Sequence, residues 1–211
     1  MAMFRAITAE EEAASGLMLC LKELGYTNAE KLKHRDHVHK SAIIPFLLIL
    51  GDFFSETLVP NGIAPAFHIK EEDGISRLTI AIPMTINGES LNAYPIPPLN
   101  FAVTSDNKSP SYKQQINRFV TKIGATNIVS YVKEQSNLRN RILYADPSGF
   151  PNVKSTDPKF LDVREARVIV LIRAYLFIYP YKEIQPFVQA ALDALLSMLG
   201  TLPVNDLHDT V

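Results

Sequence analysis

The residues best suited to chemistry lie in one short segment, residues 34–40, which reads His-Arg-Asp-His-Val-His-Lys and holds three of the five histidines. Histidine titrates closest to neutral pH and is the commonest metal ligand. The segment precedes an apolar run that we expect to be a helix. Three interpretations stay open: a solvated basic turn, an anion or phosphate site at a helix N-terminus, or a metal site. An anion site would use Arg35, His37, His39 and Lys40.

A metal site would need a further ligand, and Glu10 is the nearest candidate. On a helix, Glu10 projects near the centre of the apolar stripe that includes Ala14 and Leu17. A carboxylate directed toward a core needs a cation or a metal as partner. The first turn of the helix can instead lie at the edge of the core, which is the alternative we favour. Zinc takes three or four protein ligands, and no second cluster is visible. We favour no metal; if one binds, its ligands are expected to be Glu10, His34, His37 and His39.

A second basic region lies between residues 108 and 141, where Glu134 is the single acidic residue. Tyrosines and a phenylalanine are interleaved with its cations. This composition fits a surface that follows the phosphates of a nucleic acid, and it also fits the solvated side of two amphipathic helices. The nucleic-acid interpretation would use Lys113, Arg118, Lys122, Lys133, Arg139 and Arg141.

Hydrophobic periodicity and turn signals predict the elements that must position these residues. We expect helices over residues 9–24, 41–58, 110–123, 126–144, 162–178 and 181–199. Thr8 and Glu11 form the pattern of a capping box for the first helix, and Gly25 is its expected stop. For the second, a start at Ser41 would place Pro45 in the first turn, where its missing amide costs little, whereas a start at Asp36 would place Pro45 inside the helix and kink it. We favour the later start.

Between residues 64 and 96 the apolar period changes to that of strands. Strands are expected over residues 66–71, 76–85 and 89–96, with Asp73-Gly74 and Asn87-Gly88 as hairpin turns. The predicted fold class is α+β and mostly α-helical: a helical bundle with a small antiparallel β-meander inserted at about 64–96. We expect residues 1–211 to form a single domain with a loose tail at 200–211.

Composition sets broad limits. The chain has 211 residues, a net charge of −1 and one cysteine, Cys20, which excludes an intramolecular disulfide. The longest apolar run, residues 42–50, is about half of what a bilayer span needs. There is no glycine-rich phosphate loop, GxSxG or HExxH motif. We therefore expect a cytoplasmic protein that binds no membrane and needs no cofactor.

An alanine-rich helix with paired glutamates (Glu11-Glu12, followed by Ala13-Ala14) precedes His37-x-x-Lys40 in the first fifty residues. This pattern resembles the helical abortive-infection proteins of the HEPN class. The resemblance implies a helical, usually dimeric protein, and in many members a metal-independent ribonuclease of a toxin or antiphage system. The interval between Arg35 and His39 is shorter than in active members.

Carried onto this chain, the resemblance implies that Arg35, His37 and His39 face RNA. One of them would be a general base at the 2′-hydroxyl, with Arg35 or Lys40 stabilising the phosphorane. It also implies a homodimer with two such clusters across one cleft.

Three hypotheses follow, in this order. The first is a nucleic-acid- or nucleotide-acting protein of a defence or toxin type, ribonuclease-like and metal-independent, with RNA or a nucleotide as its partner. Its catalytic residues would be Arg35, His37, His39 and Lys40. The second is a non-catalytic protein-interaction module that docks through the meander edge or the last two helices. The third is a metal-dependent hydrolase that uses Glu10 and the histidines.

Overall fold

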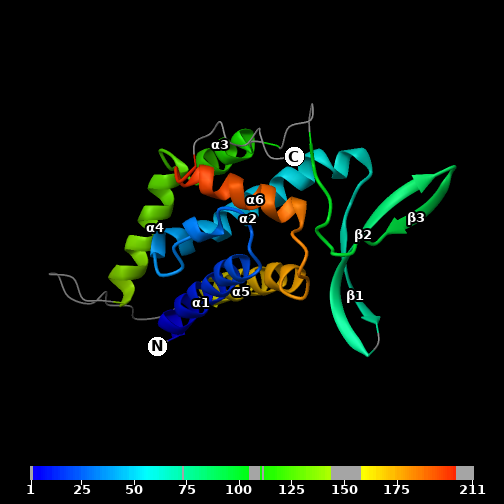
Figure 1. Cartoon of the computed structure of the whole chain (residues 1–211). Coiled ribbons are helices and arrows are strands. Elements are labelled where there is room, and N and C mark those ends of the chain that lie inside the picture. Colours follow the sequence, from blue (N-terminus) through cyan, green and yellow to red (C-terminus); the bar gives the residue numbers. More distant parts are fainter. Residues whose placement is uncertain (1, 73, 105–109, 111, 144–157, 203–211) are drawn as a thin grey trace.

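The computed structural model describes residues 2–72, 74–104, 110, 112–143 and 158–202. In this part of the chain six α-helices accompany one three-stranded antiparallel sheet, so the protein has the α+β, mostly helical fold predicted above (Figure 1). The helices are α1 (Ala2–Glu23), α2 (His37–Thr57), α3 (Lys113–Lys122), α4 (Ile128–Leu143), α5 (Pro158–Ile178) and α6 (Pro186–Met198). The strands are β1 (Ala66–Glu72), β2 (Ile75–Ile86) and β3 (Glu89–Ala93). Two short 3₁₀ helices, Ala29–Lys31 and Val59–Asn61, flank α2.

Helix α2 lies at the centre of the helical body and contacts α1, α3, α4 and α6 (Figure 1). Most of its apolar side chains are buried, among them Ile43, Phe46 and Ile49. By length and composition alone, α2 is also apolar enough to cross a membrane, although half of that stretch is buried inside the fold. A central helix of a helical core has the same composition, so this is weak evidence for a membrane span.

The first helix begins at Ala2, seven residues before the predicted start. No glycine or proline interrupts residues 2–8, and Ile7 is buried, so packing favours the longer helix. The predicted capping box of Thr8 and Glu11 is therefore wrong, because both residues lie inside α1. Gly25 ends the helix as predicted, in a left-handed conformation with φ of 78°.

The second helix begins at His37, four residues before the predicted Ser41. Asp36 is its N-cap, and the Asp36 carboxylate accepts a hydrogen bond of 2.8 Å from the amide of Val38. Pro45 consequently lies inside the helix, where its lost backbone bond is tolerated within a well-packed core. This start places His37, His39 and Lys40 on the first turn of α2.

The meander has the predicted strand order, and its residues 66–93 fall within the predicted insertion. The first half of β2 pairs with β1, from Ala66 opposite Ala81 onward, and its second half pairs with β3. Pro83 lies past the segment that pairs with β1, where a missing amide is tolerated. Asn87 and Gly88 both have positive φ, as a tight hairpin turn requires. The strands extend from one side of the helical body (Figure 1).

The remaining helices differ from prediction mainly at their ends. α3 begins at Lys113, so the predicted start at Pro110 is wrong, whereas Gly124 ends that helix as expected. α5 begins earlier than predicted, at Pro158. α6 begins later than predicted, at Pro186, because proline is favourable in the first turn of a helix. The loop predicted after α4 and most of the predicted tail lie outside the described residues.

One buried side chain joins three segments that are distant in sequence. Gln185 is fully buried, and its amide donates to the carbonyl of Phe177 at 2.9 Å and accepts from the amide of Leu99 at 2.8 Å. The backbone amide of Gln185 also donates to the hydroxyl of Tyr26. These bonds satisfy the buried amide and fix the end of α5 against the connection that follows the sheet.

Candidate functional site

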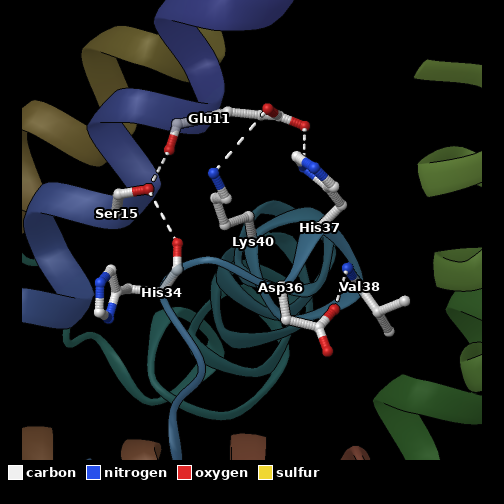
Figure 2. A network of polar contacts seen from close by, with 7 residues as sticks. All are labelled: Glu11, Ser15, His34, Asp36, His37, Val38 and Lys40. Atoms are coloured by element: carbon white, nitrogen blue, oxygen red, sulfur yellow. Dashed lines mark hydrogen bonds and ion pairs between the residues drawn. The ribbon is translucent and has the colours of Figure 1, made fainter. Parts of the chain in front are cut away.

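The polar cluster at the start of α2 is centred on Glu11, which reaches across from α1 (Figure 2). One carboxylate oxygen of Glu11 lies 3.0 Å from Nδ1 of His37, and the other lies 3.9 Å from Nζ of Lys40. The side chains of Glu11 and Lys40 are 11% and 9% exposed, whereas that of His37 is 32% exposed. The imidazole of His37 is therefore partly exposed to solvent, while the shielded carboxylate of Glu11 binds it on the protein side.

The geometry assigns roles to the two ring nitrogens of His37. When Nδ1 donates to Glu11, the neutral ring carries its free lone pair on Nε2. A carboxylate in this position fixes the orientation of the ring and stabilises the imidazolium that forms when Nε2 takes a proton. Lys40 keeps the shielded Glu11 carboxylate partly neutralised. This arrangement is suited to proton abstraction by His37.

A serine fixes the loop before α2 to α1. The hydroxyl of Ser15 lies 2.8 Å from the carbonyl of Glu11 and 3.3 Å from the carbonyl of His34 (Figure 2). Ser15 thereby ties the residue that precedes Arg35 to the helix that supplies the carboxylate. The imidazole of His34 points away from that carboxylate (Figure 2), so the structure does not bring His34 into the cluster.

His39 is turned into the protein rather than toward a ligand. It is buried, and its Nδ1 accepts a hydrogen bond of 3.3 Å from the amide of Lys33. Burial lowers the pKa of His39, an effect that Asp36 opposes and that Lys33 and Lys22 reinforce. The neutral ring of His39 therefore supports the loop, and the structure separates it from the predicted catalytic partners His37 and Lys40.

The N-terminus of α2 is capped by the protein itself, because the carboxylate of Asp36 accepts a hydrogen bond from the amide of Val38. A helix N-terminus capped in this way has fewer free amides for an outside anion than the predicted anion site would need. Arg35 precedes the cap and is exposed. Of the cations in the segment, Arg35 is thus the one most open to a phosphate, while Lys40 is shielded beside Glu11.

Glu10 lies on the side of α1 that meets α5, and its partners come from that helix. One carboxylate oxygen of Glu10 lies 2.7 Å from Nη1 of Arg164, and the other lies 3.6 Å from Nη1 of Arg167. Glu10 is therefore bound by arginines and does not converge with the histidines. Within the described ranges, no three His, Cys, Asp or Glu side chains are close enough to hold a metal ion.

The second basic region is placed on α3 and α4. Lys113, Lys122 and Lys133 are exposed. Arg118 instead forms an ion pair with Glu56 of α2, and the amide of Gln115 also donates to Glu56. Arg139 and Arg141 belong to α4, but their side chains lie outside the described part of the structure. Helix α4 packs against α2, and the first turns of α2 lie beside it (Figure 1).

The sequence pattern predicts a capping-box role for Glu11, so Glu11 is not among the predicted residues of the cluster. A second apolar stripe on α1 contains the pattern from which the role of Glu11 could be predicted. Ile7, Glu11, Ala14 and Met18 recur at helical spacing, and all four are buried. A glutamate within a second apolar stripe indicates a carboxylate with a cationic partner on a neighbouring helix.

The sequence matches no protein-family model, and neither a curated protein nor a solved structure is significantly similar to it. The resemblance to HEPN proteins therefore stays a prediction, as does every function drawn from it.

Proposed function

We propose that this protein acts on RNA as a metal-independent ribonuclease, with His37 as the general base. The observation that carries the proposal is the hydrogen bond between Glu11 and His37. It holds Nδ1 of the partly exposed His37 against the shielded Glu11 carboxylate, so that Nε2 is directed away from Glu11. Carboxylate-oriented histidines of this kind abstract protons from hydroxyl groups.

The reaction follows from the chemistry of RNA. Nε2 of His37 takes the proton of a 2′-hydroxyl, and the 2′-oxygen attacks the adjacent phosphorus. The bond from phosphorus to the 5′-oxygen breaks, and water protonates the departing oxygen. The products are a 2′,3′-cyclic phosphate and a free 5′-hydroxyl, and His37 releases its proton to solvent. Arg35, exposed one residue before the cap, supplies positive charge near the phosphate.

The exposed lysines of α3 and α4 supply a path for the RNA backbone. Lys113, Lys122 and Lys133 are free of the ion pair that holds Arg118, and α4 packs against the helix that carries His37. Phosphate contacts of this kind position a strand without reading its sequence. The proposal therefore expects weak sequence preference.

The test is cleavage of a labelled single-stranded RNA in the presence of EDTA. Wild-type protein should release fragments that end in 2′,3′-cyclic phosphate. His37→Gln should lower the cleavage rate by roughly 10²–10⁴, the usual contribution of a general base. His68→Gln, which changes an exposed histidine on β1, is the matched control and should cleave normally. Cleavage that requires a divalent metal, or that survives His37→Gln, contradicts the proposal.

A second candidate function, a non-catalytic interaction module, is favoured by a different observation. Apolar side chains are exposed along the meander and on α5, among them Phe67 at 58% and Ile69 at 76%. Soluble monomers rarely leave contiguous apolar patches of this kind uncovered. A protein that neither binds nor cleaves RNA, but associates through this face, would support the second candidate over the first.

A further inference from the structure

The outer side of α5 is apolar although it faces solvent. Helix α5 packs against α1 and β2. Its side toward α1 carries the fully buried Leu171 together with the two arginines that bind Glu10. Its opposite side carries Ile169, Ile172 and Leu176, which are 40%, 48% and 42% exposed. These three residues recur at intervals of three and four, the spacing of a seam between packed helices.

Strand β1 extends this apolar surface past the end of α5. The ring of Phe67 contacts that of Phe177, with centroids 5.4 Å apart, and the guanidinium of Arg173 lies over Phe67. Ile69 lies on the same side of β1 as Phe67, because alternate residues of a strand share a face. We call the surface formed by Ile169, Ile172, Leu176, Phe67 and Ile69 the α5–β1 face.

The charges on this face are arranged symmetrically about Ile169. Glu165 lies one turn before Ile169 and Arg173 one turn after it, and both are exposed. If two copies of α5 pack antiparallel about a two-fold axis at Ile169, Glu165 of each copy lies opposite Arg173 of the other. Two identical ion pairs then flank the apolar centre. A surface that complements itself in this way is the requirement for an isologous dimer.

We propose that the α5–β1 face is the interface of a homodimer, in which α5 packs antiparallel against α5 of a second copy. This inference is independent of the proposed ribonuclease. The cluster of Glu11, His37 and Lys40 lies between α1 and α2, whereas Ile169, Ile172 and Leu176 lie on the exposed side of α5, opposite the buried Leu171 that faces α1. The two clusters of this dimer therefore do not share one cleft, in contrast to the arrangement that the HEPN resemblance implies.

Sedimentation velocity over a concentration series tests the dimer, with charge reversals as variants. Wild-type protein should sediment at about twice the chain mass of 23.6 kDa. Glu165→Arg and Arg173→Glu should each raise the dissociation constant at least about tenfold, because each variant places like charges in contact. The double variant restores opposite charges in reversed order and should recover most of the affinity. A wild-type monomer at all concentrations overturns the proposal, and so does a double variant weaker than both single variants.

A cysteine substitution tests the two-fold axis directly. Ile169→Cys places one thiol beside its own symmetry mate, so mild oxidation should yield a disulfide-linked dimer. Val163→Cys is the control, because Val163 is 50% exposed on another side of the same helix, far from its mate in this register. The native Cys20 is buried and should not interfere. Equal cross-linking of both variants would contradict the proposed axis.

Discussion

Glu10 and Glu11 are adjacent in the chain, yet their carboxylates are bound by different helices: Glu10 by Arg164 of α5 at 2.7 Å and Glu11 by His37 of α2 at 3.0 Å. Successive residues of a helix point about 100° apart, so one turn of α1 supplies an anion to each of two neighbours. The same turn therefore has a structural role on one side and carries the candidate site on the other.

Replacing Glu10 should destabilise the fold more than replacing its exposed neighbour. Glu10→Gln leaves Arg164 and Arg167, which are 15% and 27% exposed, without their anion. We expect a loss of about 2–3 kcal/mol in the free energy of unfolding, measured by urea denaturation. Glu12→Gln changes an exposed glutamate of the same turn and should cost less than about 0.5 kcal/mol. Equal effects of the two variants would refute the role of Glu10.

Stability should decrease in mild acid through His39. Burial lowers the pKa of His39 below its usual value of 6.5, so the unfolded chain takes up the proton at a higher pH than the folded protein. The stability gained from the neutral ring is thus present above about pH 6.5 and is lost as the pH falls below it. His39→Gln, measured by urea denaturation at several pH values, should show a smaller loss between neutral and acid pH than His68→Gln.

The single cysteine should be inert in the folded protein. Burial, with a smaller effect of Glu23, raises the pKa of the Cys20 thiol to about 11, and the side chain lies in the core. A buried thiol with so little thiolate reacts slowly with disulfide reagents. Ellman's reagent should therefore detect almost no thiol in native protein and one thiol per chain in denaturant. Rapid reaction of the native protein would show that α1 opens readily.

The lysines of α3 and α4 should control RNA affinity without controlling chemistry. Replacing Lys113, Lys122 and Lys133 by Gln should weaken RNA binding. It should also reduce the slope of log K against log salt concentration by about two, since each phosphate contact on a single strand contributes about 0.7 to that slope. Fluorescence anisotropy at several salt concentrations measures both quantities. Replacing Lys22, Lys31 and Lys182 by Gln provides a control of equal charge, and an effect of the same size there would indicate binding by net charge alone.

Much of the fold could be predicted from local signals. Positive-φ positions at Gly25, Asn87 and Gly124 ended their elements where expected, because turn chemistry acts over a few residues. The sequence alone favours the later start of α2, because a proline inside a helix costs a backbone hydrogen bond, yet the structure has Asp36 as the N-cap and Pro45 inside the helix. Central packing allows a proline within the helix, and no local pattern reveals that packing.

The candidate site was predictable only in part. Segment 34–40 is recognisable from its composition, but the residue at which α2 begins decides which histidine is exposed. With the start at His37, the His37 ring contacts Glu11 and the His39 ring is buried. The partners of Glu10 lie more than 150 residues further along the chain. The second hypothesis named the last two helices as a docking surface, but hydrophobic periodicity alone does not show which side of α5 stays exposed.

The central claim is that Glu11 and His37 act as one catalytic unit, and single-turnover RNA cleavage with a double-mutant comparison tests it most directly. Glu11→Gln and His37→Gln should each slow cleavage, and the double variant should be about as slow as His37→Gln alone, because a carboxylate that acts through a histidine adds nothing once that histidine is gone. Circular dichroism confirms that each variant is folded. Independent, multiplicative losses, or a wild type that leaves RNA intact, would contradict the account.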